Sequence, residues 1–225
     1  MSVEQAREQM IEQQVRAWEV LDARVLALLR NVPRELFVPE SQRFLAFADV
    51  EVSLAHGQHM LRPNIVGRLL QSLELTGSER VLEIGAGTGF VTACLAAASA
   101  QVKSFEVFAD LADRARTNLA ASGARNAEVV TADAMQAGVQ LEPSAGSGGA
   151  RYHAIAVTGS LPVYDERFQR LLEVGGRLFI IVGDAPVMEA RLIRRVAEDG
   201  WVTESLFETV VDPLINARRP PGFTF

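Results

Sequence analysis

The stretch Val81–Phe90 reads Val-Leu-Glu-Ile-Gly-Ala-Gly-Thr-Gly-Phe and indicates the fold. Its first four residues are typical of a short buried strand, and the next five form a tight glycine turn. An alanine-rich stretch typical of a helix, Phe90–Ala98, follows at once. Because glycine has no Cβ, Gly85 and Gly87 can turn sharply and let a ligand touch the backbone. Amides freed at the helix start would then face that ligand.

The residues on either side continue the alternation of strands and helices. Further strands are predicted at 102–106, 127–131, 155–158 and 177–182, and a helix at 111–122 closed by Gly123. This alternation predicts an α/β fold: a doubly wound, mostly parallel sheet of the seven-stranded type with helices on both faces.

The N-terminal part predicts a helical extension. Apolar residues from Gln5 to Arg30 follow a helical spacing that indicates two amphipathic helices, with Asp22 as N-cap of the second. Residues 44–62 indicate a loop with short extended pieces, and Pro63 could open a helix over 64–73. We expect a single domain over 1–225, made of N-terminal helices and an acceptor-site segment (1–78), an α/β core (79–216) and a C-terminal tail (217–225).

Composition excludes several classes of protein. The 225 residues are 48% hydrophobic, enough for a packed core, and the net charge of −6 argues against a nucleic-acid binder. The single cysteine, Cys94, allows neither an internal disulfide nor a thiolate metal cluster. No signal peptide is visible and no apolar run approaches the ~20 residues of a membrane span, so we expect a cytoplasmic protein without membrane association. The oligomeric state is not indicated.

Two carboxylates could bind the same ligand as the glycine turn. Glu106 ends the second strand about 20 residues after the first glycine, where an acid can chelate ribose hydroxyls. Asp133 follows the third strand, where it could accept a hydrogen bond from an adenine amino group. All three loops open at the carboxyl edge of the sheet, where such folds bind ligands.

Together these residues resemble the cofactor site of class I S-adenosylmethionine-dependent methyltransferases. The resemblance implies S-adenosylmethionine as cofactor and no metal. The candidate cofactor-binding residues are Glu83, Gly85, Ala86, Gly87, Gly89, Glu106, Val107, Asp133 and Ala134. For Glu83, a place near the cofactor or the loop amides competes with a buried structural role. Alternatives for the turn are a role in packing only and an NAD site, although NAD sites place a third glycine where this chain has Phe90.

A narrower resemblance spans nearly the whole chain. The matching segments resemble protein-L-isoaspartate O-methyltransferases in order and spacing. They are residues 7–17, 32–39 (Val-Pro-Arg-Glu-Leu-Phe-Val-Pro), 56–58, 63, 157–158, 175–178, 182–183 and 213–214. The resemblance implies methylation of the free carboxylate of isoaspartyl residues in damaged proteins, the first step of their repair.

One segment departs from that family. The family carries Gly-Gln-Thr-Ile-Ser-Gln-Pro with an active-site serine, whereas this chain reads Gly57-Gln58-His59-Met60-Leu61-Arg62-Pro63, with Leu61 in place of the serine. Asp212 also stands before Pro213-Leu214, where the family has an apolar residue. A leucine offers no hydrogen bond to a carboxylate.

Two explanations of this departure stay open. Either His59 or Arg62 acts in catalysis and binds the acceptor carboxylate, with Gln58 and Leu61 also lining its site, or the acceptor has changed. The loop by itself favours a changed acceptor, and the whole-chain match favours the family's reaction. Three functions follow: methylation of a protein or peptide carboxylate, methylation of another small acceptor, and cofactor binding without catalysis. His56, His59 and His153 lack the number and spacing of a metal site.

Overall fold

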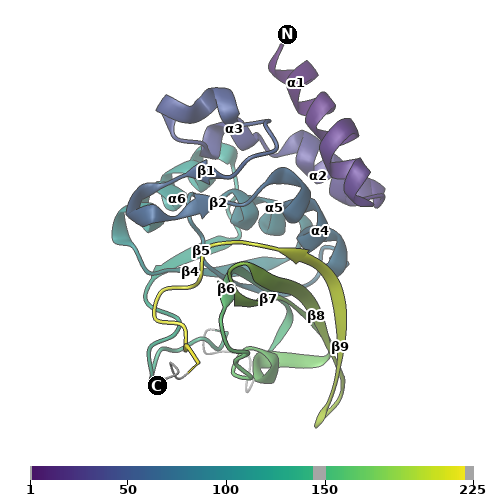
Figure 1. Ribbon diagram of the computed structural model, residues 1–225, viewed down its shortest axis with the longest axis vertical. Helices are drawn as coiled ribbons and strands as arrows, with labels where there is room; N and C mark the ends of the chain where they lie inside the picture. The colour runs from purple at the N-terminus through teal and green to yellow at the C-terminus, as the bar shows by residue number, and fades with distance from the viewer. Residues whose placement is uncertain (1, 144–150, 221–225) are drawn as a thin grey trace.

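One seven-stranded sheet organises the molecule in the order β5–β4–β3–β6–β7–β8–β9 (Figure 1). The computed structural model describes residues 2–143 and 151–220. The strands are β3 (Arg80–Ile84), β4 (Gln101–Glu106), β5 (Ala127–Thr131), β6 (Tyr152–Leu161), β7 (Leu172–Asp184), β8 (Val187–Ala197) and β9 (Gly200–Thr209). The first five of these pair in parallel, and β8 and β9 join antiparallel. The predicted mostly parallel α/β sheet is confirmed.

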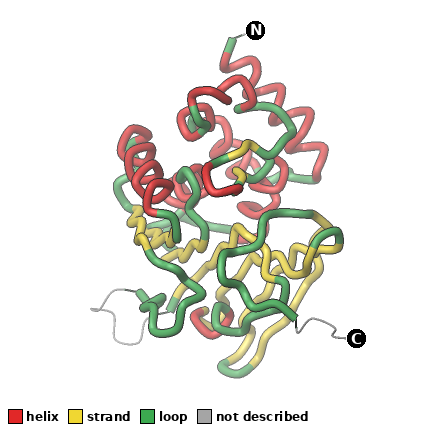
Figure 2. The backbone as a smooth tube through the Cα atoms, turned by 60° about the vertical axis from the view of Figure 1, so that its left-hand side comes forward, coloured by secondary structure: helices red, strands yellow, loops and turns green. Residues whose placement is uncertain are grey.

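The helices gather on one face of this sheet (Figure 2). They are α1 (Val3–Met10), α2 (Ala23–Asn31), α3 (Arg34–Phe37), α4 (Pro63–Leu73), α5 (Phe90–Ala98) and α6 (Ala109–Ser122). Their apolar side chains share one core with every second residue of the strands, such as Val81 and Val102. This alternation follows from the two-residue period of a strand.

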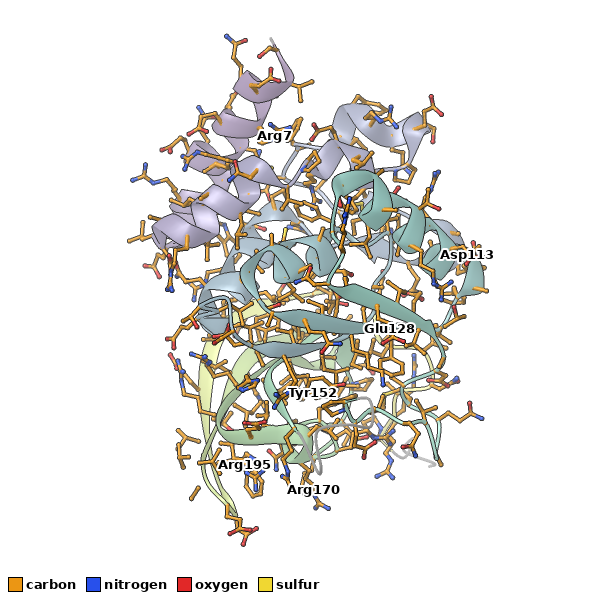
Figure 3. The ribbon with its side chains drawn as sticks, turned by 180° about the vertical axis from the view of Figure 1, so that it is seen from behind. Arg7, Asp113, Glu128, Tyr152, Arg170 and Arg195 are labelled. Carbon is orange, nitrogen blue, oxygen red and sulfur yellow. The ribbon has the colours of Figure 1, made fainter. Side chains whose placement is uncertain are left out.

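The opposite face differs from the sequence prediction of helices on both faces. Within the described residues it carries loops and one short 3-10 turn, η5 (Gln169–Leu171). A second core covers it, built from Leu82, Ile155 and Phe168 among others, with Tyr152 on this side of the sheet (Figure 3). The Tyr152 hydroxyl donates to the carbonyl of Leu141 at 2.8 Å. Apolar loop residues thus bury this face without an α-helix.

The N-terminal extension forms the two predicted helical stretches. The first continues from α1 through the turns η1 (Ile11–Val15) and η2 (Arg16–Trp18). Asp22 caps α2, because its carboxylate accepts from the Arg24 amide at 2.8 Å. This prediction of an N-cap is confirmed.

Short elements connect the helices to the sheet edge. After α3 come the turns η3 (Glu40–Leu45) and η4 (Ala55–Gly57) and a two-stranded sheet of β1 (Val52–Ser53) and β2 (His59–Met60). Beyond β9 the chain returns to the sheet, where Ser160 donates its amide to the Asp212 carbonyl and accepts from the Leu214 amide. Residues 221–225 of the predicted tail lie outside the described residues.

Candidate functional site

A cleft opens at the carboxyl ends of β3, β4, β5 and β6, as expected for a sheet of this kind. Its volume is about 770 Å³, including the part open to solvent. Segment 51–61 and the returning segment 211–215 form its outer walls. Of the nine candidate cofactor residues, the structure brings six to this cleft: Gly85, Gly87, Glu106, Val107, Asp133 and Ala134.

The glycine turn has the backbone geometry that only glycine adopts easily. Gly85, Gly87 and Gly89 have φ of +96°, +54° and +92°. A Cβ on Gly85 would lie 2.4 Å from Oγ1 of Thr158, so the turn also needs glycine for close packing. At Gly87 a Cβ would meet only Leu54, at 3.5 Å. Gly87 is therefore the position where the backbone lies open to the cleft.

Four amides of this turn are hydrogen-bonded within the protein. Gly85 and Ala86 donate to the carbonyl of Phe105, and Gly89 donates to Ala86. The Gly87 amide donates to Oε2 of Glu106 at 2.8 Å. The turn bends back onto β4, so these four amides are satisfied inside the protein.

Glu106 lies at the centre of the cleft wall. Its side chain is buried, with Oε2 on the Gly87 amide and Oε1 accepting from the Phe108 amide at 3.0 Å. Burial raises the pKa of Glu106, and the backbone hydrogen bonds oppose that rise. Each carboxylate oxygen can accept two hydrogen bonds and here accepts one from the protein, so both retain capacity for hydroxyl donors of a ligand.

Asp133 is held at the end of the cleft formed by the loop after β5. Its Oδ1 accepts from the Met135 amide and its Oδ2 from the side-chain amide of Asn216, both at 2.8 Å. Sequence reasoning did not single out Asn216. The bond across 83 residues joins the C-terminal segment to the predicted base-binding loop.

Glu83 lies behind the glycine turn and does not line the cleft. It is fully buried, and its Oε2 accepts from the hydroxyls of Thr92 at 2.5 Å and Ser104 at 2.6 Å. Its Oε1 has no partner. The side chain points to the helical face because Glu83 alternates with Leu82 and Ile84, which belong to the core of the opposite face. Of the two roles left open, the structure favours the buried one.

Two other predicted residues lie beside the cleft. Ala86 lines a second, smaller hollow next to it. Gly89 packs against α6, where a Cβ would lie 3.2 Å from the Cα of Ala115. Gly89 thus sets the approach of α5 to α6 and has no place in the cleft wall.

The structure places only some of the residues predicted to bind the acceptor in the cleft. Gln58, His59 and Leu61 line the cleft, whereas Arg62 does not. The Arg62 side chain is half exposed and lies 4.0 Å from Glu51 in a surface ion pair. The hypothesis that Arg62 holds a carboxylate in the cleft is therefore not supported by its position.

His59 pairs with the other residue that departs from the family. Its Nδ1 lies 2.9 Å from Oδ2 of Asp212, and both residues line the cleft. An aspartate that accepts from Nδ1 fixes the orientation of the ring and keeps Nε2 available. The structure thus brings together His59 and Asp212, two residues that differ from the family pattern and are 153 positions apart in the sequence.

A second histidine fastens segment 51–61 at the other end of the cleft mouth. The His56 ring stacks on Phe108 with centroids 4.0 Å apart, and its Nε2 lies 2.8 Å from Asp110 at the start of α6. Sequence reasoning predicted neither of these contacts of His56. Together with the His59–Asp212 pair, these contacts join segment 51–61 to the start of α6 and to the returning segment 211–215.

The described residues show neither a metal cluster nor a membrane-spanning helix. In residues 2–143 and 151–220, no cluster of three or more His, Cys, Asp or Glu side chains could hold a metal ion. No helix in that part of the chain is long and apolar enough to cross a membrane.

Comparisons with known proteins agree with this geometry. The family model "Protein-L-isoaspartate(D-aspartate) O-methyltransferase (PCMT)" matches residues 5–218. Protein-L-isoaspartate O-methyltransferase 1 of Rhodopseudomonas palustris (strain HaA2) is 40% identical over 211 residues, which cover 93% of this chain and 82% of that protein. The protein-L-isoaspartate O-methyltransferase of Methanoculleus marisnigri is 39% identical, covering 87% of this chain and 84% of its own length.

Solved structures show the same fold. A Plasmodium falciparum structure described as a protein-L-isoaspartate O-methyltransferase in complex with S-adenosyl-L-homocysteine superposes with a TM-score of 0.77 at 18% identity, covering 95% of this chain and 98% of that one. Another structure of a protein-L-isoaspartate O-methyltransferase gives 0.74 at 21% identity, over 92% and 65% of the two chains. With the family model matching nearly the whole length, the chain belongs to the protein-L-isoaspartate(D-aspartate) O-methyltransferase family.

Proposed function

We propose that this chain is an S-adenosylmethionine-dependent O-methyltransferase that methylates the carboxylate of isoaspartyl residues in proteins or peptides. The observation that carries the proposal is the cleft at the ends of β3, β4 and β5, with Glu106 and Asp133 in its walls. Family membership supports the same reaction. Because segment 51–61 and the core residues line one cleft, we also propose that residues 1–225 act as a single domain.

The cleft has the acceptors that the ribose and adenine of S-adenosylmethionine require. Glu106 has free acceptor capacity on both oxygens for the two ribose hydroxyls. Asp133 offers an acceptor for the adenine amino group, between the apolar walls of Val107 and Ala134. The open backbone at Gly87 leaves room for the amino-acid part. The residues present therefore fit this cofactor.

In methyl transfer the main task of the protein is to align the methyl donor with the acceptor. S-adenosylmethionine supplies a methyl group on a sulfonium that is already activated for transfer. A carboxylate acceptor, with an ordinary pKa of about 4, is ionised at neutral pH, so no base has to remove a proton. The side chains around the cleft have to orient the acceptor and exclude water.

We propose His59 as the residue that orients the acceptor. With Nδ1 turned to Asp212, an Nε2–H group can donate to an acceptor carboxylate, the role that the family's serine would have. Gln58 and Leu61 form the neighbouring wall. Asp212 is then a positioning residue that acts through His59.

Leu61 favours a second candidate function, methylation of a different acceptor. This side chain is buried, 8% exposed, and lines the cleft where the family's hydroxyl stands. An apolar side chain there suits an acceptor with less need for hydrogen bonds. A cofactor-binding protein without catalysis is the third possibility.

Transfer of label separates the three functions. The protein is incubated with tritiated S-adenosylmethionine and either an isoaspartyl peptide or its normal aspartyl isomer as the matched control. Base-labile label on the isoaspartyl peptide alone is the expected result. Absence of transfer, while calorimetry still shows cofactor binding, would contradict the proposed acceptor. The variant Leu61→Ser then shows whether the missing hydroxyl is the cause, because it would gain the activity.

A further inference from the structure

A second hollow of about 370 Å³ lies beside the cleft, on the side of the N-terminal helices. The two hollows share several wall residues, among them Leu61, Gly87 and Thr158, so they adjoin. Most of its wall is apolar, with Val66 and Phe90 as examples. Two polar side chains of this wall, Arg34 and Thr88, are not among the sequence-based candidates.

Arg34, from the segment Val32–Pro39, is the first of these groups. Its side chain is 1% exposed and lies over the Phe90 ring, 4.8 Å from the centroid. Its Nε donates to the carbonyl of Ala46 at 2.9 Å and its Nη2 to the carbonyl of Leu61 at 2.8 Å, but Nη1 has no partner. The guanidinium thus has two neutral acceptors and an unused donor.

The charge of Arg34 is also not neutralised by the protein. Burial lowers the pKa of Arg34 to about 10, and the Cys94 thiol, not a carboxylate, is the group that opposes this. At neutral pH the guanidinium therefore stays charged. A buried cation without an anion is costly, and such groups are normally paired. In this protein the unpaired cation lies in the wall of the second hollow.

Thr88 is the second unpaired group of the same hollow. Its side chain is 4% exposed and its Oγ1 has no partner. The residue is fixed in place, because its carbonyl accepts from the side-chain amide of Asn118 at 2.9 Å. One wall of the hollow thus carries a cation and another a hydroxyl, and neither has an acceptor for its free hydrogen.

We propose that Arg34 Nη1 and Thr88 Oγ1 form a carboxylate-binding subsite next to the methyl-transfer cleft. A single negative charge matches the single guanidinium, and a planar carboxylate can accept from both donors. The inference rests on the proposed function, which brings two carboxylates to the cleft: that of the cofactor's amino-acid part and that of the acceptor. Both have the chemistry of the subsite, and affinity measurements distinguish them.

Position 88 allows a matched pair of variants. Thr88→Val removes the hydroxyl and keeps the shape, whereas Thr88→Ser keeps the hydroxyl and serves as the control. Arg34→Lys keeps the charge but loses the planar donor pair. Because the Thr88 hydroxyl has no partner in the free protein, Thr88→Val is expected to leave the melting temperature unchanged or raise it. The position-88 pair decides the matter if Arg34→Lys does not fold.

Calorimetry measures affinity for S-adenosylhomocysteine and for 5′-methylthioadenosine, which lacks the amino-acid part, and steady-state kinetics gives KM for an isoaspartyl peptide. If the subsite binds the cofactor's carboxylate, Thr88→Val lowers the affinity for S-adenosylhomocysteine about tenfold. The affinity for 5′-methylthioadenosine then falls less than twofold. If it takes the acceptor's carboxylate, the KM rises by a similar factor and both nucleosides bind as before. Thr88→Ser stays near wild type in either case.

Three results would overturn the subsite. The first is unchanged affinity and KM in Thr88→Val, with wild-type methylation intact, which leaves the proposed function standing. The second is equal weakening of both nucleosides, which would show a general distortion of the glycine turn. The third is a melting temperature several degrees lower in Thr88→Val, which would show that the hydroxyl supports the free fold. A wild-type protein that binds neither nucleoside would refute the proposed function as well.

Discussion

The buried carboxylate of Glu83 makes the stability of the protein depend on pH in a direction that can be measured. Its side chain is 0% exposed, and burial raises its pKa from 4.5 to about 7, against the opposing hydrogen bonds from Ser104 and Thr92. A folded-state pKa above the unfolded one means that the protonated form stabilises the fold. The stabilisation is complete below the unfolded pKa and is lost as pH rises through about 7.

The size of the effect follows from the shift. A change of about 2.5 pKa units, at about 1.4 kcal/mol each, corresponds to about 3.5 kcal/mol in full, of which about 3 kcal/mol is lost between pH 4.5 and 8. Glu83→Gln has no charge to bury, and its amide oxygen can still accept from Thr92 and Ser104. The free energy of unfolding of Glu83→Gln minus that of wild type is therefore expected to rise by about 3 kcal/mol over this range.

Urea unfolding of both proteins at a series of pH values measures this difference. Glu79→Gln is the matched control, because burial would raise the pKa of Glu79 but hydrogen bonds from Thr76 and Gly77 lower it overall. Its contribution is lost only as pH falls, so its difference from wild type should stay constant from about pH 6 upward. Calorimetry should also show that Glu83→Gln binds S-adenosylhomocysteine within about twofold of wild type. If the unfolding free energies of wild type and Glu83→Gln depended on pH in the same way, the reasoning would be refuted. A large loss of affinity for S-adenosylhomocysteine would show that Glu83 contributes to cofactor binding.

Three further predictions concern the cleft and the glycine turn. Glu106→Gln should lower the affinity for S-adenosylhomocysteine about 10- to 100-fold in calorimetry, because an amide lacks the charge and has one acceptor oxygen fewer. An unchanged affinity would show that Glu106 does not bind the cofactor. Asp212→Asn should raise the KM for an isoaspartyl peptide about tenfold and leave nucleoside affinity alone, because it releases His59; an unaltered KM would exclude this positioning role. Gly89→Ala should cost about 1–3 kcal/mol of unfolding free energy in urea, given its φ of +92° and the nearby Ala115 backbone, and a neutral effect would contradict the packing argument.

The alternating core of the fold could be predicted from the sequence because its signals are local. The strand–turn–helix unit at Val81–Ala98 has a buried strand, turn glycines and a helix former in direct succession, and the helix at 90–98 is observed with the predicted bounds. The pair β8 and β9 was not predicted, because Met188-Glu-Ala-Arg-Leu-Ile-Arg-Arg also suits an amphipathic helix. Its pairing with β7 is a long-range effect that overrides local preference.

The site could be predicted only where position along a strand decides which way a residue faces. Glu106 is the last residue of β4, Asp133 follows β5, and both lie in the cleft, whereas Glu83 is inside β3 and turns to the helices. Contacts between distant segments, such as Asp133 with Asn216, leave no local pattern. The unpaired donor of Arg34 was equally hidden, because only the packed structure shows which donors lack partners.

A crystal structure with S-adenosylhomocysteine tests the central claim most directly. The account predicts one nucleoside in the cleft, with its ribose hydroxyls on the Glu106 carboxylate and its adenine amino group on Asp133. Electron density for the nucleoside elsewhere, or both carboxylates turned away from it, would contradict the account.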